Sequence, residues 1–228
     1  MIQDDNVAQI EIFRELSILG SPQLAADFMK RISKTVSGIW SPIEINPHEW
    51  GGNTFCFSCG ETEEHPAAKL WFAKSHNKNK LYVSNIVPLN MNSLTKTEYN
   101  RILMEFYKTF IEPFPVDKGL EIIVEEDLVG LDHWLDEEAI RRLNSFSNCA
   151  NKSTGTGHPL DERRWWLFCF YIHDKGFFSK FYPDILGRWL NEVLGWHEEG
   201  AHKLALNYER TLRTLEAYNE YHITGDVN

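Results

Sequence analysis

The pattern of apolar and turn residues changes along the chain, and this change constrains the fold more than any other feature of the sequence. Residues 38–88 contain short β-like apolar runs separated by turn residues, a pattern typical of an antiparallel meander. Beyond residue 131 the apolar residues recur at helical spacing instead. We therefore predict an α+β fold, with an N-terminal antiparallel sheet and packed helices followed by a C-terminal helical bundle. The predicted domains are residues 1–130 and 131–228, unless the two regions share one continuous core.

Capping and turn residues predict where the elements of the first domain begin and end. A helix is expected over residues 7–19, and Ser21-Pro22 predicts the start of a second helix that runs to about Val36. Thr95-Lys96-Thr97-Glu98 fits a capping box at the start of a third helix. The predicted strands cover residues 43–45, 53–58, 69–73, 81–86 and 120–125.

The second domain is expected to consist of helices. Asp136 and Asp161 are predicted N-caps, because each precedes a segment with helical periodicity. The helix that would follow Asp161 is apolar nearly all round, which predicts the central and most buried helix. The predicted helices cover residues 137–150, 162–173, 183–194 and the segment after His197.

Negative charge is concentrated in one stretch of the chain. The formal net charge is −10, and residues 117–138 contribute −8 of it with nine acidic side chains and one lysine. Apolar residues interleave with the acids, so the stretch is expected to be folded or to bind a partner. Clustered negative charge attracts a basic protein at long range, and a tryptophan would supply an aromatic anchor. The residues predicted to bind such a partner are Glu125, Glu126, Asp127, Asp132 and Trp134.

The alternative interpretation of this stretch is structural. Asp136, Glu137 and Glu138 would then serve the start of a helix, and the other acids would solvate a strand edge and a loop.

Composition disfavours several classes of protein. The longest unbroken apolar run, Trp165–Ile172, has eight residues, far short of the roughly 18–20 that span a bilayer. The acidic N-terminus lacks the pattern of a signal peptide, and four cysteines do not make a disulfide framework. We therefore expect a cytoplasmic protein with reduced thiols and no membrane association. No run rich in lysine or arginine predicts a broad nucleic-acid-binding face, although a local one stays open.

Cys56 and Cys59 form a CxxC motif, which is the first half of many zinc sites. A structural zinc site needs four ligands, and no second CxxC or suitably spaced histidine pair follows. His65 and His76 would complete a loose candidate set. The simpler interpretation is that Cys56 packs in a strand and Cys59 begins a turn. We expect no resident metal and no cofactor.

Residues 151–165 form the most unusual segment, with Lys-Ser-Thr, two glycines, a histidine and two arginines. The segment lacks the first glycine and the Gly-Lys pair of a Walker phosphate loop, but amides and cations at a helix start can still hold an anion. The alternative is a structured loop between helices. The predicted anion- or ligand-binding residues are Lys152, Ser153, Thr154, His158 and Arg164, together with Asn85 from the end of a strand. His158 with Asp161 is the candidate catalytic pair.

Two segments share a wider pattern that spans about residues 81–165. They are Asn151–Gly155 with His158-Pro159, Asp161 and Arg164-Trp165, and Leu81–Pro88 with Glu98-Tyr99-Asn100. This combination resembles a family of uncharacterised bacterial proteins. The resemblance implies a soluble bacterial protein and transfers no activity, but it directs attention to Asn85, Lys152 and His158.

Two functions stay open. The first is a non-enzymatic protein-binding module of the immunity, antitoxin or defence-accessory type, which uses the acidic stretch and neighbouring aromatic residues against a basic partner. The second is an enzyme or a nucleotide- or anion-binding protein with its site at the Lys152–Arg164 loop. We prefer the first, because no catalytic set is complete. The sequence makes no prediction of the oligomeric state.

Overall fold

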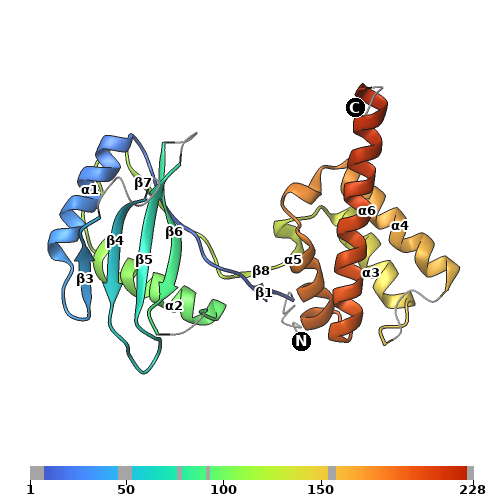
Figure 1. Cartoon of the computed structure of the whole chain (residues 1–228), viewed down its shortest axis with the longest axis horizontal. Coiled ribbons are helices and arrows are strands. Elements are labelled where there is room, and N and C mark those ends of the chain that lie inside the picture. The colour runs from blue at the N-terminus through green and yellow to red at the C-terminus, as the bar shows by residue number, and fades with distance from the viewer. Residues whose placement is uncertain (1–7, 46–52, 76–78, 91–92, 154–157, 225–228) are drawn as a thin grey trace, which may run out of the picture. The chain divides into compact units, whose positions relative to one another are not determined.

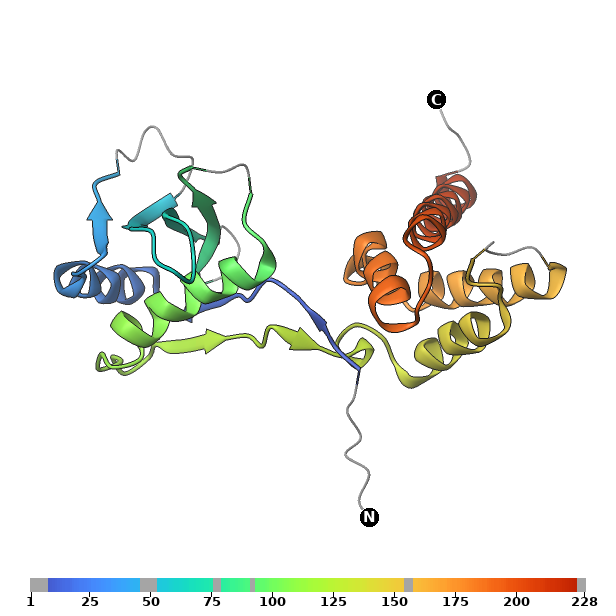
Figure 2. The same ribbon diagram turned by 90° about the horizontal axis from the view of Figure 1, so that it is seen from below.

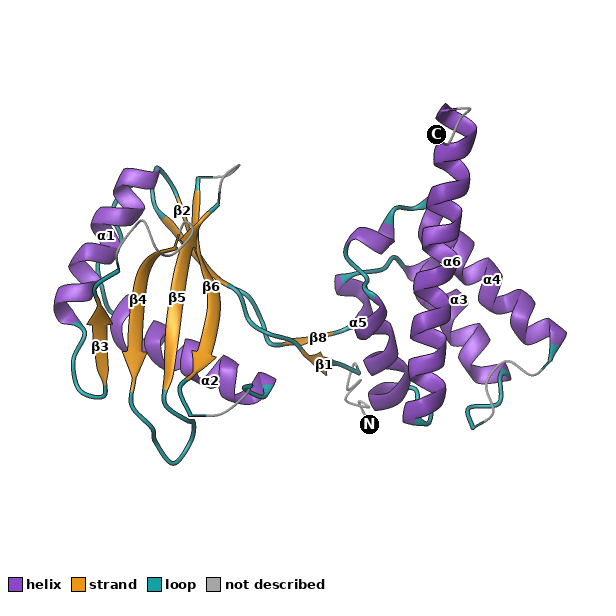
Figure 3. Ribbon diagram, viewed as in Figure 1, coloured by secondary structure: helices purple, strands orange, loops and turns teal. Residues whose placement is uncertain are grey.

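The structure is a computed structural model that describes residues 8–45, 53–75, 79–90, 93–153 and 158–224. The chain divides into two compact units: a sheet unit, Glu11–Asp127, and a helical unit, Met1–Ile10 with Leu128–Asn228. Strands β1 (Ile10–Glu11) and β8 (Leu128–Val129) lie where the chain passes from one unit to the other, and they pair with each other. The predicted α+β class is confirmed (Figure 3). The domain boundary predicted after residue 130 stays a prediction.

A six-stranded antiparallel sheet forms one layer of the sheet unit (Figure 1). Its strands are β2 (Leu16–Leu19), β3 (Trp40–Ile43), β4 (Asn53–Cys59), β5 (Ala68–Lys74), β6 (Lys80–Pro88) and β7 (Glu121–Val124). The strand order is β3-β4-β5-β6-β2-β7. Strands β3 to β6 form the predicted meander, and β2 lies between β6 and β7, where Ser17 is opposite both Tyr82 and Ile123.

The helix predicted over residues 7–19 is wrong. The described part of this segment contains β2, in which Leu16 and Ile18 are fully buried. The two side chains alternate with Ser17 and so point to one face of the sheet, as a strand requires. Backbone pairing on both sides of β2, together with burial of these side chains, outweighs the local helical spacing.

Two helices pack against the concave side of the sheet. Helix α1 (Pro22–Thr35) begins as predicted, because Ser21 Oγ accepts the N–H of Leu24. Helix α2 (Lys96–Phe106) begins at the predicted capping box and continues into a π-helical turn, Tyr107–Ile111. The sheet curves so that α2 lies between strands β4–β6 and strand β7 (Figure 2). The enclosed core is aromatic, with Phe106 at 4.6 Å from the ring of Phe57.

In its described residues the helical unit contains four packed α-helices joined by shorter turns. They are α3 (Glu137–Cys149), α4 (Pro159–Asp174), α5 (Pro183–Arg188), which continues into a π-helical turn at Trp189–Val193, and α6 (Glu198–Thr224). The polar groups of two buried aromatic side chains are hydrogen-bonded. Trp196 Nε1 donates to Ser147 Oγ at 2.8 Å, and Tyr208 Oη donates to the carbonyl of Phe181 at 2.9 Å. Within the described residues, no helix is long and apolar enough to cross a membrane.

Helix α4 differs from its prediction in two ways. It begins at Pro159, and His158 rather than Asp161 is the N-cap. Proline favours the first turn because its missing N–H would have no intrahelical partner there. Only one face of α4 is buried, although apolar residues cover most of its circumference.

Candidate functional site

The acidic stretch divides between the two units at Asp127 and Leu128. Two of its acids in the sheet unit are neutralised by arginines from distant parts of the chain. Asp127 Oδ1 lies 2.6 Å from Arg14 Nη2, and Asp117 forms an ion pair with Arg31. These two carboxylates stabilise the fold and do not add to a free acidic surface.

The other three acids of the stretch in this unit lie on or next to the edge strand of the sheet. Glu121 is the first residue of β7, and Glu125 and Glu126 follow its last residue; all three side chains are exposed. In the described part of the chain, no lysine or arginine makes an ion pair with any of them. We call these three residues the β7 acidic edge.

The backbone of β7 also offers hydrogen-bonding groups. The N–H of Glu125 donates to the carbonyl of Glu15 at 2.9 Å. Bonded and non-bonded positions alternate along an antiparallel ladder, so the backbone groups of Ile122 and Val124 are directed away from β2. Because β7 is the last strand in the sheet order, these groups lie at an open edge.

In the helical unit, Trp134 does not offer its ring to a partner. Its side chain is only 5% exposed and lies 6.1 Å, centroid to centroid, from the ring of Phe181. The predicted aromatic anchor is therefore corrected: apolar packing inside the unit covers this residue. Asp132 is exposed, and its role in binding a partner stays a prediction.

The acids at the start of α3 act as the structural interpretation expected. Asp136 accepts the N–H of Ala139 and the hydroxyl of Tyr171, each at 2.9 Å. Desolvation works against ionisation, but these two hydrogen bonds outweigh it and hold the pKa of Asp136 below its usual value. Glu138 forms ion pairs with Arg141 and Arg142 on the same helix.

Asn85 lies on β6, where the sheet opens. The ladder between β2 and β6 ends at Ser17 and Tyr82, whereas β6 continues to Pro88 and pairs there with β5 alone. A hollow of about 460 Å³ occupies the gap.

The hollow is apolar on one side. Asn85 lines it together with Phe13, Leu94 and Tyr99, and the rings of Phe13 and Tyr99 meet edge to face at 4.9 Å. Burial raises the pKa of Tyr99 to about 12, so its hydroxyl stays neutral. Among the described residues no cationic side chain lines the hollow itself, and Lys96 Nζ lies 5.2 Å from the centroid of the Phe13 ring in its wall. Asn85 belongs to the sheet unit, whereas the other predicted anion-binding residues belong to the helical unit.

Several described polar groups of the Lys152–Arg164 loop are engaged within the helical unit. Lys152 Nζ donates to the carbonyl of Leu194 at 2.6 Å, at the end of the π-helical turn after α5, where a positive charge is favourable. The N–H and the hydroxyl of Ser153 both donate to Asn151 Oδ1, an Asx-type turn. Thr154 lies outside the described residues. No contact of the described loop residues favours an anion site, which stays a prediction.

His158 and Asp161 do not form the pair that general base catalysis would require. Nδ1 of His158 accepts the N–H of Leu160 at 3.2 Å as the N-cap of α4. Asp161 is buried, and its Oδ1 accepts from Arg164 Nη1 at 2.9 Å. The N–H of Asp161 donates to the carbonyl of His158 at 2.9 Å, but the imidazole and the carboxylate have other partners, so the carboxylate does not orient the imidazole.

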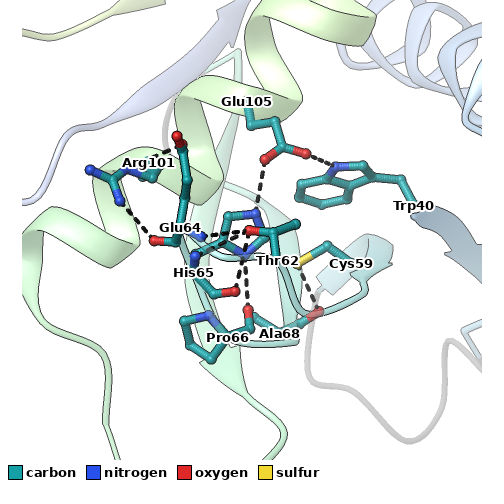
Figure 4. A network of polar contacts seen from close by, with 9 residues as sticks. All are labelled: Trp40, Cys59, Thr62, Glu64, His65, Pro66, Ala68, Arg101 and Glu105. Atoms are coloured by element: carbon teal, nitrogen blue, oxygen red, sulfur yellow. Dashed lines mark hydrogen bonds and ion pairs between the residues drawn. The ribbon is translucent and has the colours of Figure 1, made fainter. Parts of the chain in front are cut away.

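A buried polar network surrounds His65, whose side chain is fully enclosed (Figure 4). Its Nε2 lies 2.8 Å from Glu105 Oε2, and its Nδ1 lies 3.0 Å from the carbonyl of Pro66. Glu105 also accepts from Trp40 Nε1 at 2.7 Å. The network joins β3, the β4–β5 connection and α2.

The two cysteines of the CxxC motif lie on opposite faces of the sheet. Side chains alternate along a strand, and Cys56 and Cys59 are three residues apart on β4. Cys59 packs in the core and donates to the carbonyl of Ala68, whereas Cys56 is paired with Ile43 and Trp71 on the other face. Burial raises the pKa of Cys56 to about 11, which disfavours the thiolate that metals need.

No metal centre is assembled from the candidate ligands that the structure describes. His65 lies near Cys59, but Cys56 points elsewhere, and His76 lies outside the described residues. Among the described residues, no group of three or more histidine, cysteine, aspartate or glutamate side chains has the arrangement of a metal site.

Glu121 and Glu105 were not among the predicted site residues. Glu121 had a detectable signal, because alternation in the predicted strand 120–125 places it on the same face as Glu125. No sequence pattern could have indicated Glu105, because it contacts His65 across 40 residues of sequence.

Comparison of the chain with protein-family models, with curated proteins and with solved structures finds no match.

Proposed function

We propose that the chain is a protein-binding module whose sheet unit receives a basic partner along the β7 acidic edge. The observation that carries this proposal is the contrast among neighbouring acids. Asp117 and Asp127 have arginine partners, whereas Glu121, Glu125 and Glu126 are exposed and have none among the described residues. The more specific assignment to an immunity, antitoxin or defence-accessory class stays a prediction.

The edge favours an extended basic segment over other partners. Such a segment would hydrogen-bond with the outward backbone groups of Ile122 and Val124, and its lysine or arginine side chains would meet the carboxylates. A second copy of β7 is disfavoured, because like charges would then lie opposite each other.

The experiment is a selection of displayed random peptides against the full chain. We expect the selected peptides to be rich in lysine or arginine and to bind more weakly as the salt concentration rises. The triple charge reversal E121K/E125K/E126K is expected to weaken their binding by roughly thirtyfold, because it replaces three attractive charge pairs with repulsive ones.

The matched control is E61K/E63K/E112K, which makes the same change of net charge at three exposed acids elsewhere in the sheet unit. It is expected to retain most of the affinity. The proposal fails if the selected peptides show no excess of basic residues, or if the two triple variants lose affinity equally.

A further inference from the structure

Helix α4 carries an apolar face that remains partly exposed among the described residues. Trp166, Leu167 and Phe170 are 37%, 43% and 43% exposed, and Leu160 is 54% exposed. A helix that is apolar all round normally lies inside a protein, and contiguous exposed apolar surface of this kind marks a contact site. This face belongs to the helical unit, so the inference below does not rest on the β7 acidic edge.

Two charged residues flank the apolar side chains on the same face. Arg163, Leu167, Phe170 and Asp174 follow one another at intervals of four, three and four residues, which places all four on one side of a helix. Arg163 has no ion pair or hydrogen bond within the described residues, and the only ion pair of Asp174 there is with the neighbouring His173, at 3.4 Å. We call these four residues, with Leu160 and Trp166, the α4 outer face.

The order of charges on this face is self-complementary. The spacing of four, three and four residues is the same in both directions, with a cation at one end and an anion at the other. When two such helices lie antiparallel, the arginine of each meets the aspartate of the other. A parallel arrangement would oppose Arg163 to Arg163 and Asp174 to Asp174.

We propose that the α4 outer face binds a second copy of this chain, with the two α4 helices antiparallel about a twofold axis that passes between residues 168 and 169. In this arrangement Leu167 of each copy packs on Phe170 of the other, and Arg163 of each pairs with Asp174 of the other. The contact is isologous, as in most homodimers, and the antiparallel helix dipoles add to the attraction.

The size of the face sets the strength of the dimer. One helix face buries less than the roughly 800 Å² per partner of a standard interface. We therefore expect a reversible dimer with a dissociation constant in the micromolar range, populated at high protein concentration and not at low concentration.

The test is sedimentation equilibrium of the full chain over a wide range of concentration. The variants Arg163→Asp and Asp174→Arg are each expected to weaken dimerisation by about tenfold, because like charges then meet at both ends of the contact. The double variant R163D/D174R is expected to restore it. The two residues lie roughly 16 Å apart along one helix, too far to pair within a copy, so rescue reports pairing between copies.

Leu167→Glu is the second variant and is expected to abolish the dimer. Its matched control is Leu89→Glu, which places the same charge at a similarly exposed leucine of the sheet unit and is expected to leave the dimer intact. Far-ultraviolet circular dichroism of each variant verifies the helical content.

Three results would overturn the inference. The first is a wild type that sediments as a monomer at every concentration. The second is a dimer that the double charge exchange does not restore. The third is binding of the monomer to vesicles of anionic phospholipid that Leu167→Glu abolishes, which would assign the α4 outer face to a lipid surface.

Discussion

The ion pairs of the two units span very different distances along the chain. In the sheet unit, Arg14 reaches Asp127 across 113 residues. In the described part of the helical unit, the ion pairs join near neighbours, as with Glu209 and Arg213 one turn apart on α6. Most ion pairs of the sheet unit therefore form only when segments far apart in the sequence meet, whereas those described in the helical unit form within one helix or between neighbouring residues.

This difference affects which acids remain available at the surface. In the helical unit the charged residues of a helix neutralise one another locally, as Glu138 does with Arg141 and Arg142. In the sheet unit most ion pairs depend on distant residues that the fold brings together. Arg14 contacts the backbone carbonyl of Glu125 at 3.4 Å, but its ion pair is with Asp127, and no described cation pairs with the Glu125 carboxylate. The unpaired charge of the β7 acidic edge is thus a consequence of long-range topology.

The largest expected effect concerns the core that this topology assembles. Phe106 is fully buried and its ring lies within 6.0 Å of the rings of Trp40, Phe57 and Phe72 from three strands. We expect Phe106→Ala to lower the free energy of unfolding by about 4 kcal/mol, because it removes a buried ring and leaves a cavity. Chemical denaturation followed by tryptophan fluorescence measures the change.

Phe13→Ala is the control for the core variant, since Phe13 is half exposed in the same unit. Phe13→Ala is expected to lower the free energy of unfolding much less than Phe106→Ala does. Equal losses for the two variants would show that the long-range aromatic core does not dominate the stability of the sheet unit.

A second prediction compares one long-range pair with one local pair. A double-mutant cycle of His65→Ala and Glu105→Ala is expected to give a coupling energy of about 2 kcal/mol, because His65 is enclosed and its partner atom lies at 2.8 Å. The same cycle for Glu209 and Arg213, a solvent-exposed pair, is expected to give about 0.4 kcal/mol.

Urea denaturation of each set of variants measures both couplings. Raising the salt concentration is expected to remove the coupling of the exposed Glu209–Arg213 pair and to reduce that of His65 and Glu105 by a smaller fraction, because His65 is enclosed. Equal coupling energies for the two pairs at low salt would show that the long-range pair stabilises the sheet unit no more than the local pair stabilises the helical unit.

The same contrast explains which elements could be predicted from the sequence. Helices α1 and α2 were predicted because their start signals are local: Ser21-Pro22 and the capping box at Thr95 act within one turn. Strand β2 was missed because its partners, β6 and β7, lie far along the chain. A local window that contains Leu16 and Ile18 fits either a helix or a strand.

The candidate sites show the same limit. Acidity of the stretch was visible in the sequence, but the pairing of Asp127 with Arg14 was not, and neither was the burial of Trp134. In the Lys152–Arg164 loop the structural interpretation could be formed from local rules, since the contacts of Ser153 and His158 lie within two residues. The contact of Lys152 with Leu194 spans 42 residues and could not be predicted.

The smallest expected effect tests a local contact inside the sheet unit. Thr95 Oγ1 accepts the N–H of Glu98, and the N–H and hydroxyl of Thr95 donate to Glu98 Oε2. These two hydrogen bonds from Thr95 hold the pKa of Glu98 below its ordinary value. We expect Thr95→Ala to lower the free energy of unfolding by about 1 kcal/mol at neutral pH.

The pH dependence of this variant separates the charged contact from a general loss of packing. A depressed pKa in the folded state means that ionised Glu98 stabilises the fold above its ordinary pKa, and this contribution is lost as the pH falls through the depressed value. The difference between wild type and Thr95→Ala is therefore expected to narrow on acidification. Thr211→Ala removes a hydroxyl that donates to the carbonyl of Asn207 on α6, a contact without a charge, so its effect is expected to stay constant with pH. If the free-energy difference between wild type and Thr95→Ala is equally constant with pH, the Glu98 carboxylate contributes nothing through Thr95. The local charged contact at the start of α2 would then not stabilise the sheet unit.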